Sequence, residues 1–531
     1  MSHIGLPPCD SAAILHGELS IAPCSPAARR WTLVAAILGS SLAFIDGTVV
    51  NVALPALQRE LNASASELQW VMESYALLLA ALLLVGGTLG DRYGRKRVFM
   101  IGVVLFTVAS LACAASSTAT LLICARAVQG AGAALMVPGS LALISSAFPP
   151  SERGAAIGTW SAFSGITAAI GPVIGGWLVD NYSWTWAFLV NLPLGVLLLA
   201  ICLLRVPEST GGDTSPVDLP GAVLATLGLA GVVYTLIQAP AQGWTNPLVG
   251  GALVLGMAAL SWFVMVERRS AAPMLPLALF GERNFAGANL LTLLLYAALG
   301  GGLFFLPLNL IQVQGMGATA AGAALLPFIA IMFVLSRWAG TLVDQFGAKL
   351  PLVAGPAIAA LGFALFMLPG VGANYWTAFF PAVCVLGLGM SVTVAPLTTT
   401  VMNAVGAERA GMASGVNNAV SRAAGLLAIA AFGILLAWAF NASLGNALAG
   451  AQLAPELVSA VLAQRDKLAG IAIPGGTSAA HAQVLHTAIG AAFVAGFRWV
   501  MGLCALLALL SALSAWLLVD GKHAAAGAPS T

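Results

Sequence analysis

This chain contains few charged residues. Asp, Glu, Lys and Arg make up 8% of its 531 residues, whereas in a soluble domain the share is about a quarter. Hydrophobic residues make up 60%, and the mean hydropathy is +0.96. Water is therefore not the main solvent of the chain, and a row of soluble domains is excluded.

Motifs for catalysis and metal binding are also absent from the sequence. It has no GxxxxGK(S/T) loop for a nucleotide, and its seven cysteines form no CxxC pair or other ligand spacing. His481 and His486 are five residues apart, which does not place them on one face of a helix. We therefore expect no enzyme activity, no metal and no cofactor. The net charge of +2 is close to neutral, so nucleic acid is not expected as a partner.

Long apolar runs recur along the whole chain. Each is about twenty residues long, the length at which a helix crosses a bilayer. Counting these runs predicts fourteen transmembrane helices, one of them near 350–370. With both termini in the cytoplasm, most Lys and Arg residues fall in cytoplasmic loops, as the positive-inside rule requires. The sequence thus predicts an all-α protein that spans the lipid bilayer of the cytoplasmic (inner) membrane.

Two segments of the sequence are repeated at nearly the same distance. Gly87-Thr-Leu-Gly-Asp91 returns 253 residues later as Gly340-Thr-Leu-Val-Asp344, and Ser-Glu-Arg-Gly at 151–154 returns 256 residues later as Ala-Glu-Arg-Ala. Repeated halves are typical of membrane transporters. Two six-helix bundles with two additional spans between them account for both repeats.

The repeat and the apolar runs predict the following organisation. The run after Arg30 continues past Asp46 without a small-residue cleavage site, so it is expected to be a first span and not a signal peptide. The parts are a disordered cytoplasmic tail (1–30), an N-terminal six-span bundle (31–206), two linker spans (217–266), a C-terminal six-span bundle (284–519) with an outer loop (441–487), and a cytoplasmic tail (520–531). A short amphipathic helix is expected near 453–468 of the loop.

Three ionisable residues inside predicted spans are the main candidates for proton coupling. Asp46, Glu73 and Arg126 belong to the first, second and fourth spans and are expected at a similar depth, about 8 to 11 Å below the outer surface. Charges inside a bilayer are costly and mark functional sites. Arg126 can neutralise only one carboxylate, which leaves the other able to bind a proton near neutral pH. The alternatives are a structural ion pair between Arg126 and Asp46, and solvation of Glu73 by interfacial water.

Two glycine-rich regions are further candidates. Glycines permit close approach of backbones, so the loop between the second and third spans can form a short turn, and a small-residue face on the fifth span can pack tightly. The candidate residues of the loop are Gly87, Asp91, Arg92, Gly94, Arg95 and, in the second half, Asp344. The residues of the fifth span are Gly165, Gly171, Pro172, Gly175 and Gly176. A purely topogenic basic loop and ordinary helix packing are the alternatives.

Three residues are candidates for binding a substrate. Tyr75, Trp160 and Asn418 could face a cavity, and aromatic faces attract lipophilic cations. Membrane spans contain aromatic residues in any case, so helix packing is the alternative.

Five motifs in order resemble those of the major facilitator superfamily, and specifically its fourteen-span drug:proton antiporter group. The resemblance extends from about Trp31 to Val519. Its motifs are Asp46-Gly-Thr-Val-Val-Asn51-Val-Ala-Leu-Pro55, the loop Gly87 to Arg97, Arg126-Ala-Val-Gln129-Gly130, the stretch Gly165 to Gly176, and Trp184-Thr-Trp186 with Asn191-Leu-Pro193. The second half departs from the pattern. Gln345 and Ala348 stand at the positions equivalent to Arg92 and Arg95, and the second half has no arginine equivalent to Arg126.

The resemblance implies the major facilitator fold, a cavity lined by the first and fourth spans, and a fifth-span motif associated with antiport. It also implies that the loop residues Gly87 to Arg95, with Asp344, form a gate that holds the cytoplasmic side closed and opens during alternating access. It implies export of drugs, antibiotics or other small hydrophobic or cationic molecules in exchange for protons, with periplasmic adaptor proteins as further candidate partners. One alternative is a carrier of a siderophore, amino acid or sugar on the same scaffold. A non-transporting membrane protein is less favoured.

Overall fold

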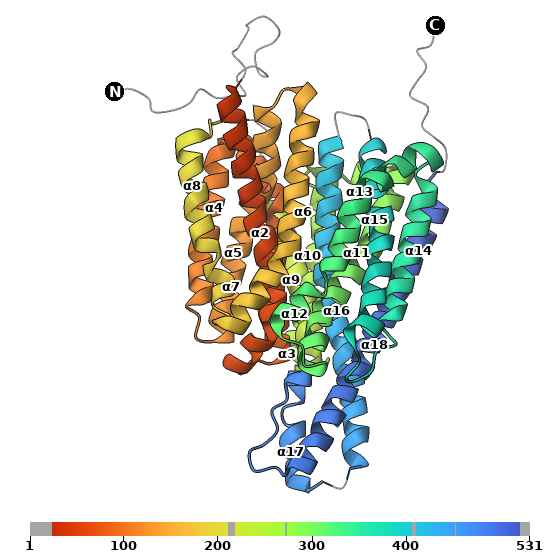
Figure 1. Ribbon diagram of the computed structural model, residues 1–531. Coiled ribbons are helices and arrows are strands. Elements are labelled where there is room, and N and C mark those ends of the chain that lie inside the picture. The colour runs from red at the N-terminus through yellow and green to blue at the C-terminus, as the bar shows by residue number, and fades with distance from the viewer. Residues whose placement is uncertain (1–23, 211–217, 271–272, 406–409, 452, 521–531) are drawn as a thin grey trace, which may run out of the picture. The chain divides into compact units, whose positions relative to one another are not determined.

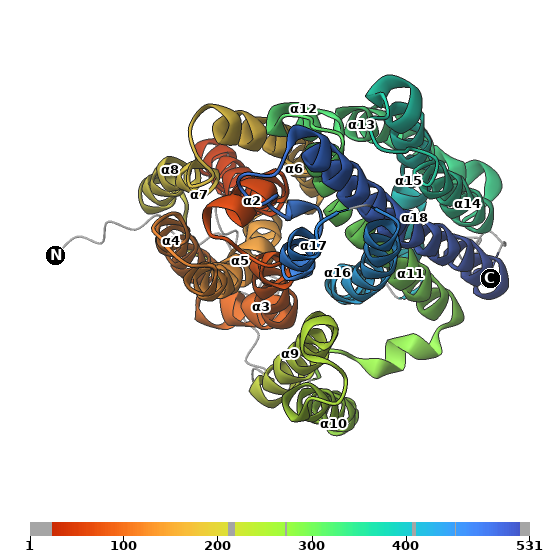
Figure 2. The ribbon, with the colours of Figure 1, turned by 90° about the horizontal axis from the view of Figure 1, so that it is seen from below.

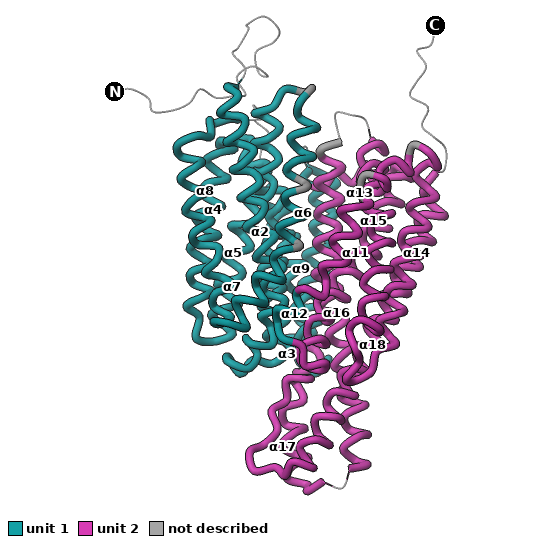
Figure 3. Tube along the Cα trace, in the orientation of Figure 1, with its two compact units in different colours: residues 1–238, 242–274, 317–322 teal, residues 239–241, 275–316, 323–531 magenta. Residues whose placement is uncertain are grey.

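The computed structural model describes residues 24–210, 218–270, 273–405, 410–451 and 453–520. Most of the two predicted tails lies outside these residues. The described chain divides into two compact units (Figure 3), and all its regular elements are helical. Unit 1 consists of residues 1–238, 242–274 and 317–322, and unit 2 of residues 239–241, 275–316 and 323–531.

Figure 1 labels the helices of both units. Those of unit 1 are α2 (Pro26–Glu60), α3 (Ala65–Tyr93), α4 (Arg95–Ala114), α5 (Ala119–Ala147), α6 (Pro150–Asn181), α7 (Trp186–Leu189), α8 (Asn191–Arg205), most of α9 (Leu219–Gln242), α10 (Pro247–Arg269) and most of α12 (Ala318–Ala323). Those of unit 2 are η1 (Leu277–Gly281), α11 (Arg283–Leu308), η2 (Asn309–Val313), α13 (Leu326–Phe346), α14 (Lys349–Leu365), η3 (Tyr375–Phe379), α15 (Phe380–Asn403), α16 (Ala410–Ala449), α17 (Pro455–Leu462), η5 (Arg465–Gly470) and α18 (Ala479–Leu518).

The predicted fold class is confirmed. Thirteen helices in the described part of the chain are long and apolar enough to cross a membrane. One further predicted span, 350–370, corresponds to α14, which is apolar but has only 17 residues. The first span begins earlier than predicted, at Pro26, because Ser25 caps α2 by accepting a hydrogen bond from the N–H of Ala28 at 3.2 Å.

The long loop of unit 2 is mostly helical. Helices α16 and α18 each have 40 residues and are therefore about 60 Å long, twice the roughly 30 Å of the hydrocarbon core. Their ends must extend beyond the bilayer, where α17 and η5 lie between them in the chain (Figure 1). The predicted amphipathic helix near 453–468 corresponds to α17 and η5.

Side-chain caps begin each helix that carries a predicted proton-coupling residue. Besides Ser25 on α2, Thr118 caps α5 by accepting from the N–H of Leu121 at 3.3 Å. Helix α3 has a complete capping box, in which Ser64 Oγ accepts from the N–H of Glu67 at 3.2 Å and Glu67 Oε2 accepts from the N–H of Ser64 at 2.8 Å. These caps define where the three helices start and therefore which residues lie deep inside them.

Small residues bring the helices of unit 1 together. Glycines at 86 and 130 let α3 and α5 approach at backbone distance, since a Cβ at either would collide with a carbonyl of the other helix. Viewed from below, α2 to α5 and α8 form one bundle and α9 and α10 lie beside each other as a pair (Figure 2). Thr235 of α9 donates to the carbonyl of Val249 in α10 at 3.2 Å.

Candidate functional site

An ion pair lies at the centre of the unit 1 bundle. Asp46 of α2 and Arg126 of α5 are both fully buried, and Arg126 Nη1 is 2.5 Å from Asp46 Oδ2. The other carboxylate oxygen accepts hydrogen bonds from Gln129 Nε2 at 2.7 Å and from Asn191 Nδ2 at 3.0 Å. Asp46 therefore has one cationic and two amide donors, an arrangement that stabilises an ionised carboxylate.

A second layer holds these donors in place. Ser110 of α4 accepts from Gln129 Nε2 at 3.1 Å and from Asn191 Nδ2 at 2.9 Å, and its own hydroxyl donates to the carbonyl of Phe188 at 3.1 Å. Gln129 Oε1 in turn accepts from Arg126 at 2.8 Å. We call Asp46, Ser110, Arg126, Gln129 and Asn191 the ion-pair network. It joins α2, α4, α5 and α8.

Helix α3 contacts the same arginine. Arg126 Nε donates to the carbonyl of Val71 at 3.1 Å, and its guanidinium carbon lies 4.2 Å from the centre of the Tyr75 ring. Val71 and Tyr75 are four residues apart and share one face of α3. The predicted substrate residue Tyr75 is thus buried against Arg126.

Glu73 is placed differently from Asp46. It is also fully buried, but neither of its carboxylate oxygens has a hydrogen-bond partner among the described residues. Its position between Val71 and Tyr75 in the sequence turns it away from the face of α3 that contacts Arg126. Of the two predicted acids, Asp46 is therefore the one that Arg126 pairs with, and Glu73 lies outside the network.

The predicted gate loop makes a tight connection between α3 and α4. Gly94 has φ +110°, which a residue with a side chain rarely adopts. Asp91 Oδ1 accepts from Arg95 Nε at 2.8 Å, whereas Arg92 is exposed and lies over the Tyr93 ring at 5.5 Å. Gly87 is near Pro138 of α5, where an added Cβ would meet that side chain at 3.7 Å. The side chain of Asp344 lies outside the described part of the structure.

A glutamate that the sequence analysis did not identify closes this loop. Glu208 follows α8, and its Oε1 accepts from the backbone N–H of Lys96 at 2.9 Å. Its other carboxylate oxygen is 3.7 Å from Arg97 Nε. The N–H of Arg95 donates to the carbonyl of Ser209 at 2.8 Å. The segment after α8 thus binds the first turn of α4, where an anion complements the helix dipole.

The fifth-span motif packs α6 against α2. Gly171 lies against Thr48 and Gly175 against Val49, both close to Asp46 in the chain. A Cβ added at Gly175 would lie 2.6 Å from Val49 Cγ1. Gly165 has open space around its Cα. These contacts position the turn of α2 that follows Asp46.

The same helix binds α12. Pro172 and Gly176 lie against the α12 backbone at Gly322 and Ala318. At the end of α6, Asp180 accepts hydrogen bonds from the N–H of Ala318 at 3.0 Å and from the N–H and hydroxyl of Thr319 at 2.8 and 2.6 Å. Asp180, which the sequence analysis did not identify, therefore caps α12 from a position 138 residues earlier in the chain.

The two other predicted substrate residues lie in different surroundings. Trp160 Nε1 donates to Ser40 Oγ at 2.9 Å, and its ring packs against a small cluster with Ala36 and Ile144. Asn418, in unit 2, is exposed. Tyr75 and Trp160 both contact α2, since the Tyr75 hydroxyl donates to the carbonyl of Ala43 at 3.4 Å, one turn from Ser40. Within the described ranges, no group of three or more His, Cys, Asp or Glu residues could hold a metal ion.

Long apolar helices with a buried ion pair define an integral membrane protein of the transporter class. The sequence profile of the Major Facilitator Superfamily matches residues 36–429. This chain belongs to that superfamily, as the motifs predicted.

Named relatives agree with the assignment. The chain is 37% identical to the multidrug resistance protein Stp of Mycobacterium tuberculosis (strain CDC 1551 / Oshkosh), over 85% of this chain and 82% of Stp. It is 32% identical to the tetracenomycin C resistance and export protein of Streptomyces glaucescens, over 94% of each chain. A crystal structure of a bacterial homologue of the lysosomal transporter Spinster superposes with a TM-score of 0.67, at 17% identity and over 93% of this chain and 97% of that one. The last likeness shows the fold alone.

Proposed function

We propose that this chain is an antiporter of the cytoplasmic membrane that exports drugs, antibiotics or other small hydrophobic molecules in exchange for protons, with both termini in the cytoplasm. The names of its relatives support the substrate class, since several are resistance and efflux proteins. The positive-inside pattern of the sequence supports the orientation.

One observation carries the proton-coupling part of the proposal, namely the contrast between the two buried acids. Asp46 accepts three hydrogen bonds, one of them from a cation. Glu73 has no partner in the described structure, and burial of a charge without a partner is costly. Glu73 is therefore the acid that we assign as the proton carrier.

Helix α3 can couple the proton to the conformation. Val71 and Tyr75 on one face bind Arg126, and Glu73 lies on the other face. A rotation or shift of α3 that exposes Glu73 to water must also disturb the contacts of Arg126, because all three residues move with one helix. Loss of the proton and rearrangement of the ion-pair network are then parts of one step.

The driving force is sufficient for export. One proton that crosses a potential of 100 mV releases about 2.3 kcal/mol, which sustains roughly a fiftyfold gradient of an uncharged substrate. No nucleotide hydrolysis is required.

Ethidium accumulation in drug-hypersensitive bacteria tests this function. Cells that express the chain should accumulate less ethidium, and a protonophore or Glu73→Gln should abolish the difference. Glu282→Gln, which alters an exposed acid of unit 2, is the matched control and should export normally. Normal export by Glu73→Gln would remove Glu73 from the proton path, and no effect of the wild type would exclude ethidium-type cations as substrates.

Reconstitution of the purified chain tests whether transport needs a periplasmic adaptor protein. In liposomes with an imposed proton gradient, the purified chain alone should transport ethidium. Export in cells without transport in liposomes would instead point to a periplasmic adaptor.

A further inference from the structure

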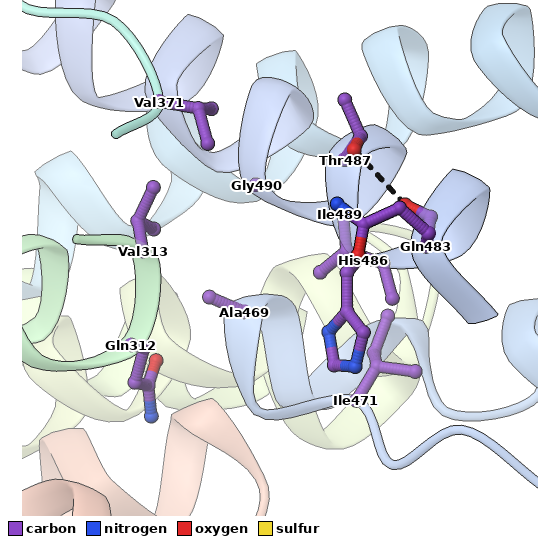
Figure 4. Close-up of a pocket in the computed structure, with 10 residues that line it drawn as sticks. All are labelled: Gln312, Val313, Val371, Ala469, Ile471, Gln483, His486, Thr487, Ile489 and Gly490. Atoms are coloured by element: carbon purple, nitrogen blue, oxygen red, sulfur yellow. Dashed lines mark hydrogen bonds between the residues drawn. The ribbon is translucent and has the colours of Figure 1, made fainter. Parts of the chain in front are cut away.

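A pocket lies in unit 2, where the long loop meets the helices that carry it. It is partly open, has a volume of about 230 Å³ and is lined by segments far apart in the chain, among them Gln312 and Val313 of η2, Val371 after α14, Ile471 after η5 and His486 of α18. Figure 4 shows these side chains around a common space. None of them belongs to the ion-pair network. We call this site the loop pocket.

Irregular backbone forms two of its walls. Gln312 and Val313 lie in a π-helical turn, a feature found mostly at functional sites. Leu468, next to the lining residue Ala469, has φ 54° and ψ −127°, which is rare for a residue with a side chain. Strained backbone of this kind clusters at ligand sites, because elsewhere the chain relaxes. The walls therefore have the character of a binding site and not of a packing gap.

Hydrogen bonds keep the pocket in shape. Gln314 donates to the carbonyl of Gly370 at 2.9 Å and accepts from the N–H of Ala373 at 2.9 Å, which ties η2 to the turn that carries Val371. On the side of α18, Gly490 has no side chain, and a Cβ there would lie 3.4 Å from Val371. A large side chain at position 490 would consequently fill the space.

The lining side chains define the chemistry of a ligand. Val313, Val371 and Ile489 supply apolar surface, while Gln312, Gln483, His486 and Thr487 supply hydrogen-bonding groups. None of the ten lining residues is Asp, Glu, Lys or Arg. We propose that the loop pocket binds a compact, uncharged amphipathic compound, or one ring system of a larger one, and not a lipophilic cation. Its volume agrees with a small ligand, since sites for drug-sized molecules measure roughly 300 to 1,000 Å³.

In an exporter with its termini in the cytoplasm, a site at this loop would lie on the outer side of the membrane and could hold an exported molecule. This role rests on the proposed function, whereas binding itself does not. A chain that binds the ligand but does not lower ethidium accumulation would exclude ethidium-type cations as substrates and leave the loop pocket standing.

Fluorescence anisotropy of 7-hydroxycoumarin at pH 6, where this probe is uncharged, tests the proposal on the purified full-length chain. The wild type should bind the probe, and Gly490→Leu should weaken binding about tenfold or more. Gly445→Leu is the matched control, because Gly445 is also a helical glycine of unit 2 but has open space around it. Its affinity should equal that of the wild type. Val371→Trp is a second filling variant, for the case that Gly490→Leu does not fold.

The results separate the loop pocket from other sites. Weakening by His486→Ala, together with no displacement of the probe by ethidium, supports an uncharged ligand in this pocket. The proposal is overturned if the wild type does not bind, if the filling variants bind normally, or if ethidium displaces the probe competitively.

Discussion

The two units bury polar clusters of different kinds. In unit 1 the ion-pair network contains a carboxylate and a guanidinium, both fully buried. In unit 2 a partly buried polar cluster is neutral, since Asn417 of α16 donates to Asn289 Oδ1 at 3.1 Å and to Thr292 Oγ1 at 2.7 Å, both on α11. A polar contact between helices is thus stabilised by charge in one unit and by amide and hydroxyl groups in the other.

This difference supports the proposal that coupling to protons takes place in unit 1. A neutral cluster loses only ordinary hydrogen bonds when helices move, each with a net value of about 1 kcal/mol. Separation of a buried ion pair leaves a charge without a partner and costs several times more. A change in charge at Glu73 can therefore bias the conformation of unit 1 strongly, whereas the cluster of unit 2 has no charge that a proton could change.

The largest effect is expected from removing the arginine. Arg126→Ala leaves Asp46 buried without its cation and should lower the free energy of unfolding by about 3 to 5 kcal/mol. Asn417→Ala in unit 2 should cost about 1 to 3 kcal/mol. Thermal unfolding of the purified variants in detergent and ethidium export in cells measure the contrast: Arg126→Ala should unfold early and not export, and Asn417→Ala should still export. Equal losses would mean that the two clusters do not differ in kind.

Double-mutant cycles sharpen the comparison, and we expect their coupling free energies to be smaller than the loss caused by Arg126→Ala. Asp46→Asn and Gln129→Ala alter one network and should be coupled by about 0.5 to 3 kcal/mol. Asp46→Asn and Asn417→Ala alter separate clusters, so their effects on the free energy of unfolding should add within about 0.5 kcal/mol. Denaturant unfolding of the single and double variants provides the values. Strong coupling in the second pair would show that the clusters communicate.

The smallest effect is expected at α12, a segment that follows α11 in the chain but belongs to unit 1. Asp180→Ala removes its cap and should destabilise the first turn by about 0.5 to 2 kcal/mol. Faster hydrogen exchange at the amides of Ala318 and Thr319 is the measurement. Thr319→Val removes only the hydroxyl donor and should have a weaker effect. Unchanged exchange in Asp180→Ala would mean that the cap does not hold α12.

The sequence predicted the charged centre of the site better than its neutral parts. Asp46, Glu73 and Arg126 stand out because charges in apolar spans are rare and costly. Ser110 could not be assigned to them, since neutral polar residues are common in spans and their partners depend on how the helices pack. Glu208 looked like an ordinary loop acid, although an acid directly after a span in a basic loop region was a usable signal.

The composition and the long apolar runs by themselves determined that this protein is an all-helical membrane bundle, because a run of about twenty apolar residues crosses a bilayer as a helix that satisfies its own backbone. The motifs determined the superfamily. Only the tertiary structure decided which acid Arg126 binds, since that depends on the rotation of α2 and α3 about their axes, which close glycine contacts set. Those rotations leave Glu73 without a hydrogen-bond partner among the described residues and place Asp46 in the ion-pair network.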